Sequence, residues 1–427
     1  MWILSKAFLL FICLLCSSNN GAYADDNDLS HSHIVSVSSL LPPNVCNRTR
    51  TALPQGPDKA SLEVVSKYGP CSRLNQGIST HAPSLEEILR QDQQRLHLKN
   101  SRRLRKPFPE FLKRTEAFTF PAKINDTVAD EYYIVVAIGE PKQYVSLLLD
   151  TGNCNSKECP FNIQYADGSG SGGFWATDRI TIQEANSNGY FTRYPFLLGC
   201  INNSSGDKSG ASGIMGLDRS PVSIITRTNT SYFSYCLPSP YGSTGYITFG
   251  KTDTVNSKFI KYTPIVTTSE QSEFYDIILT GISVGGKKLP FNTSYFTKFG
   301  AIIDSGNIIT RLPPPIYAAL RSAFHKRMKK YKKAKGLEDL LDTCYDLSAY
   351  ETVVVPKIAI HFLGGVDLEL DVRGTLVVAS VSQVCLGFAT YPPDPNSITL
   401  GNVQQRGHEV HYDVAGRRLG FGPGNCS

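Results

Sequence analysis

One short pattern occurs twice in this chain of 427 residues, and it restricts the fold more than any other feature. "LLLDTGN" at 147–153 and "AIIDSGN" at 301–307 each run from apolar residues into an aspartate, a hydroxyl residue, a glycine and an asparagine. A second pair, "GIMGLD" at 213–218 and "SITLGN" at 397–402, follows in the same order. Repeats at this spacing predict two similar lobes that each contribute one carboxylate.

The two aspartates, Asp150 and Asp304, are 154 residues apart. Either turn alone would be an ordinary loop. If the two turns face each other, both carboxylates cannot ionise cheaply, so the pair holds one shared proton. The ionised member can then act as a general base on a water molecule while the protonated member polarises a carbonyl. The pair therefore predicts peptide hydrolysis without a covalent intermediate, a cofactor or a metal ion.

The first 24 residues have the composition of a cleaved secretory signal. Lys6 precedes an apolar run that ends near Cys16, and Ala22-Tyr23-Ala24 gives the small-x-small pattern of a cleavage site. The apolar run is too short to cross a bilayer, and no later stretch is long and apolar enough. We expect a secreted protein without a membrane span, with the vacuole as the alternative destination. Three candidate N-glycosylation sites fit this route: Asn125, Asn229 and Asn292.

Residues 25–117, here called the front segment, differ from the rest of the chain. They hold 14 Lys and Arg against 10 Asp and Glu, which accounts for most of the net charge of +6. Leu85, Ile88 and Leu89 recur at helical spacing, with Ser84 as N-cap and Glu87 three residues later. A basic, helix-prone stretch between a signal and a strand-rich body predicts a removable pro-segment. The alternative is a disordered linker.

The chain after residue 117 has an all-β texture. Short apolar runs such as "EYYIVVAIG" and "TVVVPKIAIHF" are separated by Gly, Pro, Asn and Asp. One helix interrupts them, starting at Pro314 or Pro315 and continuing through "IYAALRSAFHKRMKKY". The predicted division is an N-terminal lobe over 118–255 and a C-terminal lobe over 256–427.

Longer stretches of the chain resemble the pepsin-like aspartic proteases, and within them the plant nepenthesin-type branch. The similar stretches include "LEVVSKYGPCSRLNQG" in the front segment and "FYDIILTGISVGGKKL", "IIDSGNIITRLPPPIYAALRSAF" and "GNVQQRGHEVHYDVAGRRLGFGPGNC" in the body. The resemblance implies an all-β, bilobal fold with a peptide-binding cleft between the lobes. It also implies a monomeric endopeptidase that is made as a zymogen, with a polypeptide as substrate and the pro-segment as inhibitor.

The resemblance also assigns roles to single residues. It identifies Asp150 and Asp304 as the catalytic pair and Tyr165 as the tyrosine of a flap hairpin that closes over substrate. The supporting residues of the two turns would be Thr151, Gly152, Ser305 and Gly306. The implied disulfides are Cys344–Cys385 and Cys236–Cys426. Cys200 would pair with Cys154 or Cys159, which leaves one of the body's seven cysteines unpaired.

Two departures from the family pattern stand out. Relatives place a few dozen residues between the first Asp-Thr-Gly and the flap, whereas Tyr165 follows Asp150 by only 15 positions. Either the first lobe closes its sheet differently, or the chain is a splice or gene-model variant with a damaged lobe. Relatives also carry Ser or Thr after each Gly, where this chain has Asn153 and Asn307. An Asn amide can still donate to the catalytic carboxylate.

Two other function classes remain open. The shortened first lobe and the two asparagines favour a catalytically silent homologue that binds peptides or partner proteins. "HKRMKKYKKAKG" at 325–336 holds seven Lys and Arg and raises the possibility of an anion or nucleic-acid binder. A solvated helix end explains that run better. The rest of the body is nearly neutral, so one basic run attracts a polyanion only weakly.

Overall fold

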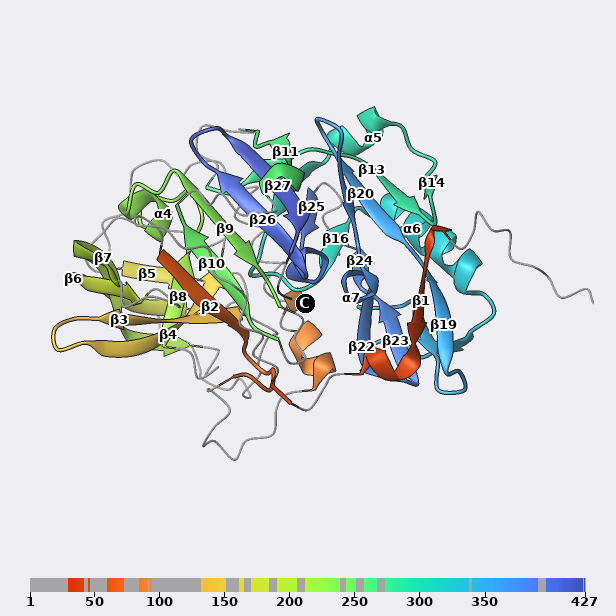
Figure 1. The fold of residues 1–427 in the computed structure, drawn as a ribbon, viewed down its shortest axis with the longest axis horizontal. Coiled ribbons are helices and arrows are strands. Elements are labelled where there is room, and N and C mark those ends of the chain that lie inside the picture. The colour runs from red at the N-terminus through yellow and green to blue at the C-terminus, as the bar shows by residue number, and fades with distance from the viewer. Residues whose placement is uncertain are drawn as a thin grey trace, which may run out of the picture.

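The computed structural model describes sixteen parts of the chain: 30–41, 45–46, 60–72, 84–90, 92–93, 132–150, 161–164, 170–183, 190–205, 212–238, 243–250, 257–266, 273–337, 340–390, 397–424 and 426. Strands dominate these residues, and Figure 1 shows them gathered into two groups side by side. The predicted all-β, two-lobed fold is confirmed.

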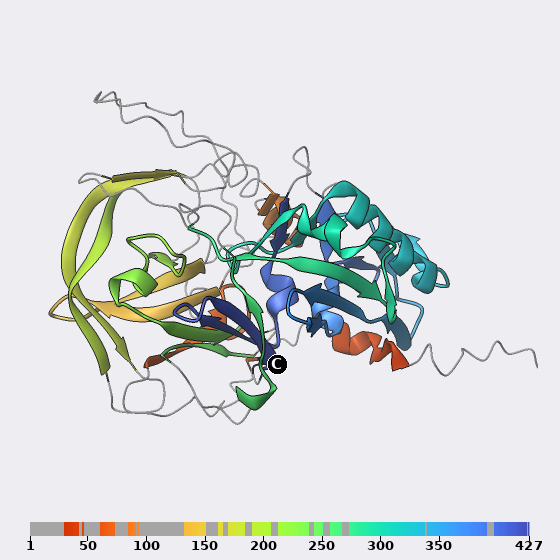
Figure 2. The same ribbon diagram turned by 90° about the horizontal axis from the view of Figure 1, so that it is seen from above.

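The largest sheet has 12 strands and forms most of the first lobe. Its main path runs in the order β11 (Lys261–Pro264), β27 (Arg418–Pro423), β26 (His408–Asp413), β9 (Tyr232–Cys236), β10 (Gly245–Phe249), β2 (Ala60–Ser66), β3 (Tyr132–Ile138), β4 (Gln143–Asp150), β8 (Gly213–Gly216). Three further strands lie off this path: β6 (Gly170–Gln183) pairs with β3, and β5 (Phe161–Gln164) and β7 (Tyr190–Ser205) both pair with β6. Figure 2 shows β6 and β7 as a long curved pair at the outer end of this lobe.

The second lobe contains smaller sheets. The five-stranded sheet runs β12 (Asp276–Ile277), β15 (Gly300–Ile303), β25 (Ser397–Leu400), β16 (Thr310–Leu312), β24 (Phe388–Thr390). One four-stranded sheet runs β14 (Lys287–Lys288), β13 (Leu279–Val284), β20 (Ile358–Phe362), β21 (Val366–Glu369). The other runs β17 (Lys332–Ala334), β18 (Cys344–Asp346), β23 (Gln383–Leu386), β22 (Leu376–Ser380).

The predicted long helix is present as α6 (Pro314–Met328), with Pro at its first turn. Its inner face buries Ile316, Leu320 and Phe324, which recur every four residues, against β13, β19 (Thr352–Pro356) and β24. The other helical elements are short: η1 (Val37–Leu40), α4 (Ile224–Arg227), η2 (Ser257–Phe259), α5 (Thr293–Thr297), α7 (Val372–Thr375), η3 (Asn402–Gln405).

The front segment is built into both lobes. β1 (Ser32–Ser36) pairs antiparallel with β19 of the second lobe, whereas β2 lies between β10 and β3 in the first-lobe sheet. Figures 1 and 2 both place the helical residues of 84–93, in orange, between the two groups of strands. The described residues therefore do not form the disordered linker that was the alternative interpretation. A disulfide that was not predicted, Cys46–Cys71, closes a loop within the segment.

Strands from the two predicted lobes share the large sheet. The C-terminal hairpin of β26 and β27 pairs through β26 with β9, so residues 408–423 belong to the same sheet as 232–236. The large sheet therefore contains strands from both sides of residue 255. The lobe boundary at this residue remains a prediction.

Candidate active site

Asp304 directly follows β15, at the point where this strand ends beside its parallel neighbour β25. The last paired residues are Ile303 and Leu400, and the Asp304 amide then donates to the Leu400 carbonyl at 3.0 Å. The carboxylate is fully buried and receives two donors. The Gly306 amide donates to Oδ1 at 2.9 Å, and Asn307 Nδ2 donates to Oδ2 at 2.5 Å. Both contacts favour the charged form of the carboxylate.

The Asn307 contact confirms one expectation from the sequence. The side-chain amide of this asparagine donates to the Asp304 carboxylate, the role that the resemblance assigns to the Ser or Thr hydroxyl of relatives. The substitution therefore preserves a donor at this position. Asn153, its counterpart in the first turn, lies outside the described residues.

The segment after β25 fixes the turn from the other side. The Asn402 amide donates to the Asn307 carbonyl at 2.7 Å, and its side-chain amide donates to the Ser305 carbonyl at 3.2 Å. The approach is so close that a Cβ on Gly401 would lie 2.6 Å from the Ile308 carbonyl oxygen. Glycine is therefore required at 401, and the "SITLGN" repeat has a structural role that its sequence alone did not show.

Two buried side chains, Gln405 and Tyr235, support the turn that begins at Asp304. Gln405 Nε2 donates to the Asp304 carbonyl at 3.3 Å and to the Leu400 carbonyl at 3.0 Å. Its Oε1 accepts from the Tyr235 hydroxyl on β9. Burial raises the pKa of the Tyr235 phenol far above its ordinary value, and the nearby charge of Asp304 raises it further. Tyr235 therefore stays protonated and remains a donor. Sequence reasoning missed both side chains, although Gln405 lies in the family-like stretch "GNVQQR".

The first turn follows the same plan. β4 and β8 pair in parallel from Leu147–Gly213 to Asp150–Gly216, just as β15 pairs with β25. The predicted repeat is thus a real structural repeat in which an aspartate ends a strand beside a parallel neighbour. Only the backbone of Asp150 is described, and Thr151 and Gly152 lie outside the described residues. The meeting of the two carboxylates stays a prediction.

A hairpin lies where the sequence predicts the flap. β5 and β6 form an antiparallel hairpin whose last pair, Gln164–Gly170, leaves residues 165–169 as the connection. Tyr165 itself lies outside the described residues, so its position over the site remains predicted.

The first lobe has an open pocket of about 360 Å³. Its lining is mainly apolar and comes from β4, β6, β7 and β8, with Trp175, Phe196, Leu198, Ile214 and Met215 among its residues. The pocket is partly open to solvent, so apolar side chains of the first lobe are accessible there.

Both disulfides implied by the resemblance are formed, Cys344–Cys385 and Cys236–Cys426. The expectation for Cys200 was wrong. This residue lies exposed on β7 opposite Phe174 and carries a free thiol, rather than a bond to Cys154 or Cys159. The pairing is implied only by the resemblance to relatives, which place a few dozen residues between the first Asp-Thr-Gly and the flap.

Two of the candidate glycosylation sites fall on described residues. Asn229 is exposed and has a positive φ of 53°. Asn292 is exposed and caps α5, with Oδ1 accepting from the Tyr295 amide at 3.0 Å. Asn125 lies outside the described residues. Glycosylation at all three stays a prediction.

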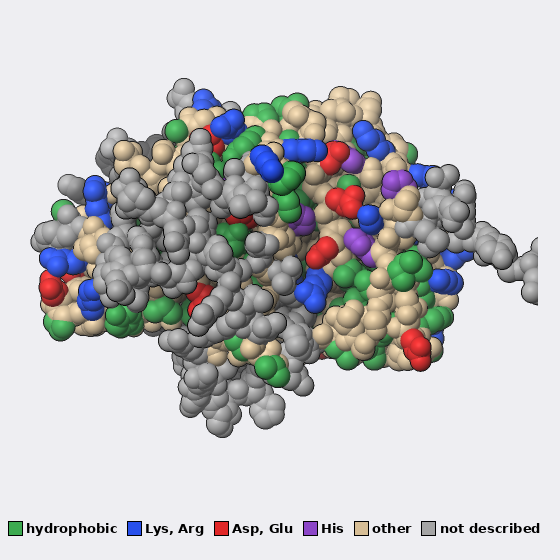
Figure 3. Space-filling model, in the orientation of Figure 1, with side chains coloured by type: hydrophobic (Ala, Val, Ile, Leu, Met, Phe, Trp, Pro, Cys, Tyr) green, Lys and Arg blue, Asp and Glu red, His purple; other side chains and the backbone are tan. Residues whose placement is uncertain are grey.

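The basic run at 325–336 has several local partners. Arg327 Nη2 donates to the Gly285 carbonyl at 2.9 Å, and Lys332 Nζ lies 3.3 Å from an Asp346 carboxylate oxygen. On the face seen in Figure 3, Lys and Arg side chains are interspersed with Asp and Glu rather than gathered. These contacts favour the interpretation as a solvated helix end.

Comparison with known proteins agrees with this architecture. Family models described as xylanase inhibitor N-terminal and xylanase inhibitor C-terminal match residues 152–251 and 274–423. The crystal structures of EDGP and of basic 7S globulin from soybean each cover 69% of this chain. Their TM-scores are 0.55 and 0.56, at 20% and 16% identity, with 92% and 93% of those chains covered. At such identities the likeness shows the fold alone.

Sequence relatives cover the whole chain. An aspartyl protease family protein of Arabidopsis thaliana is 37% identical over 481 aligned positions, covering 100% of this chain and 99% of that protein. Because this chain has 427 residues, at least 54 of the 481 positions have no counterpart in it. Aspartyl protease AED1, from the same plant, is 35% identical over 99% of this chain and 98% of its own length.

Aspartic proteinase nepenthesin-2 of Nepenthes gracilis is 31% identical over 65% of this chain and 63% of its own length. These relatives, the two parallel strand pairs that end in aspartates and the two-lobed β fold agree with one another. The chain belongs to the pepsin-like aspartic protease family, in its plant nepenthesin-type branch.

Proposed function

We propose that this protein is an aspartic endopeptidase in which Asp150 and Asp304 share one proton and activate a water molecule. The observation that carries the proposal is the structural repeat: Asp150 is the last residue of β4, which pairs in parallel with β8, and Asp304 directly follows β15, which pairs in parallel with β25. The two donors to Asp304 show how one turn stabilises a charged carboxylate.

In the proposed reaction the ionised aspartate accepts a proton from the water as its oxygen bonds to the peptide carbonyl carbon. The protonated aspartate donates its proton to the carbonyl oxygen, so the tetrahedral intermediate carries no net charge. The aspartate that took up the water proton then protonates the amide nitrogen while the other aspartate takes a proton from a hydroxyl of the intermediate. The C–N bond breaks, and the pair again holds one proton. The substrate is a polypeptide, and the flap hairpin of β5 and β6 would cover it.

The front segment supports a zymogen. β2 occupies an inner position of the first-lobe sheet, and Lys67 directly after it is fully buried. Tyr68 packs against the hydrophobic cluster that contains Ile308 and Ile309, a few residues past Asp304. A buried lysine in a segment that lies beside the catalytic turn is suited to block the site until the segment leaves.

Secretion is part of the same proposal. The disulfides Cys46–Cys71, Cys236–Cys426 and Cys344–Cys385 require an oxidising compartment, which agrees with the signal-like residues 1–24. Among the residues that the structure describes, no helix has the length and apolar character needed to cross a bilayer.

The test is cleavage of an unfolded protein by the purified, processed enzyme at about pH 4, where one of the two carboxylates is protonated. Asp304→Asn should abolish cleavage while leaving the thermal unfolding curve in place. Asp367→Asn, at an exposed carboxylate in the same lobe, is the matched control and should retain activity. Cleavage that survives Asp304→Asn would refute the assignment.

A catalytically silent peptide binder is the second candidate, and the open apolar pocket of the first lobe is the observation that favours it. A peptide inhibitor with a hydroxyl at the scissile position separates the two. An active site binds it far more tightly than the matching peptide without the hydroxyl, whereas a silent site binds both alike.

A further inference from the structure

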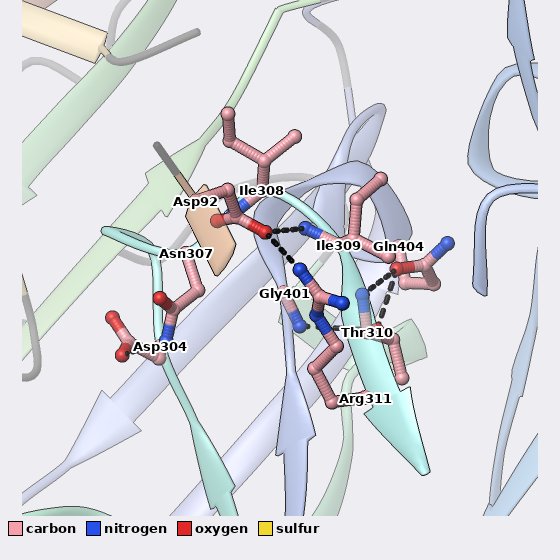
Figure 4. A network of polar contacts seen from close by, with 9 residues as sticks. All are labelled: Asp92, Asp304, Asn307, Ile308, Ile309, Thr310, Arg311, Gly401 and Gln404. Atoms are coloured by element: carbon pink, nitrogen blue, oxygen red, sulfur yellow. Dashed lines mark hydrogen bonds and ion pairs between the residues drawn. The ribbon is translucent and has the colours of Figure 1, made fainter. Parts of the chain in front are cut away.

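A carboxylate of the front segment is buried directly behind the catalytic turn (Figure 4). Asp92 is 1% exposed and accepts three hydrogen bonds. The Ile308 amide donates to Oδ1 at 2.5 Å, the Ile309 amide donates to Oδ2 at 3.3 Å, and Arg311 Nη2 donates to the same Oδ2 at 3.2 Å. The Arg311 side chain is itself buried, so this ion pair lies out of water.

Two of the three donors, the Ile308 and Ile309 amides, belong to the residues that link the catalytic turn to β16, and the third, Arg311, lies on β16. Asn307, which donates to Asp304, immediately precedes Ile308. The Ile308 carbonyl accepts from the Val403 amide, so Asp92 and the segment after β25 hold this link from different sides. A front-segment residue, 216 positions earlier in sequence than Ile308, thus helps to fix the backbone next to the active site.

Apolar side chains from residues 84–90 pack next to the site that holds Asp92. Ile88 and Leu89 are buried in one cluster with Ile308 and Ile309, and Leu85 packs against it. Ser84 accepts from the Glu87 amide at 3.2 Å, as the predicted N-cap should. The segment is therefore held by an apolar stripe at one end and by a carboxylate at the other.

The chemistry of the three donors selects a carboxylate. Two neighbouring backbone amides and a guanidinium can serve both oxygens of one planar anion, and hydrogen bonds to a charged partner are stronger than neutral ones. An isosteric carboxamide would offer only one acceptor oxygen, would lack the charge, and would place an NH₂ group against a donor. Because the site is buried, such a loss is not offset by water.

We infer that the Ile308 and Ile309 amides and Arg311 form a carboxylate-binding site, and that its ligand is Asp92, which docks the front segment behind the catalytic turn. When the front segment leaves, Asp92 must leave this carboxylate-binding site. Its bearing on proteolysis rests on the proposed function, but the docking itself does not.

Hydrogen–deuterium exchange of the full-length protein tests the docking without any need for activity. In Asp92→Asn, amide exchange in peptides covering 84–93 and 305–312 should speed up by about tenfold or more, because the docked state loses its charged ligand. Peptides covering β13 should exchange as in the wild type, which shows that the second lobe remains folded. Glu87→Gln, at a partly exposed carboxylate of the same segment, is the control and should leave both regions unchanged.

A double substitution separates a specific pair from general damage. Arg311→Met alone leaves Asp92 buried without its cation, so exchange should speed up strongly. Adding Asp92→Asn to Arg311→Met should bring little further acceleration, because the interaction is already lost. If Asp92→Asn exchanges like Glu87→Gln in both regions, or if the two effects simply add, the inference is overturned. Neither result bears on whether Asp304 catalyses proteolysis.

Discussion

A buried carboxylate on β26 provides the sharpest test of how charges stabilise this fold. Glu409 is 1% exposed, accepts from the Tyr246 hydroxyl at 2.6 Å and lies 3.3 Å from Nε2 of the fully buried His411. Burial alone would raise the pKa of Glu409, but the contacts with His411 and Tyr246 outweigh burial and lower it below its ordinary 4.5. The folded protein therefore holds this side chain as a carboxylate.

Glu409→Gln keeps the shape and removes the charge. A hydrogen bond to a buried charged group contributes about 1.5–3 kcal/mol, and we expect the free energy of unfolding at pH 7 to fall by about that amount. The matched control is Glu369→Gln. Glu369 is mostly exposed and pairs with Lys357, and exposed pairs of this kind contribute about 1 kcal/mol at most.

The pH dependence follows from the direction of the pKa shift. Because the folded-state pKa is lowered, the contribution of Glu409 is fully present above its unfolded value of 4.5 and is lost as the pH falls through the folded value. Glu409→Gln has no such charge to lose. The stability gap between wild type and variant should therefore be widest near neutral pH and should narrow in acid.

Urea unfolding followed by circular dichroism, at pH 7 and at about pH 3, measures both quantities. Equal stability of Glu409→Gln and Glu369→Gln at pH 7 would refute the assigned role. A gap that stays constant between the two pH values would show that the lowered pKa is wrong.

Three further outcomes are expected. Asn307→Ala removes a donor that favours the charged form of the Asp304 carboxylate and should move the acid limb of the pH–activity profile to higher pH, while Asn307→Ser should move it less. Replacing Cys344 and Cys385 by Ser opens a loop of 41 residues and should cost about 4 kcal/mol in unfolding free energy, seen as a lower urea midpoint. Iodoacetamide should label Cys200 in the native, unreduced protein, and mass spectrometry of Cys200→Ser should show one label fewer.

The parts of the fold that sequence predicted are those set by local pattern. Pro314 and the apolar spacing of 316–328 specify α6 within one stretch of chain. The repeated aspartate turns also share their spacing to the following glycine and asparagine. Because Asn307 lies only three residues after Asp304, its donation to that carboxylate could be expected from the sequence.

The missed features depend on partners far away in sequence. Asp92 stands among polar residues in "RQDQQR", and nothing nearby shows that Arg311 and two amides more than 200 positions later enclose it. β1 and β2 were not predicted as strands in the sheets of the body, because their partners β19 and β10 lie far away in sequence. The Cys200 pairing was wrong because it was inferred from relatives with a longer first lobe.

The inner position of β2 sets a condition on any shortened form of this protein. Its backbone hydrogen-bonds to β10 on one side and to β3 on the other. Removing β2 would divide the sheet and leave β10 and β3 with unpaired backbone groups along one edge. Such exposed edges can pair with strands from other chains. A processed molecule that stays soluble must therefore place another part of its own chain between β10 and β3. Otherwise it must keep the cleaved β2 bound in the sheet.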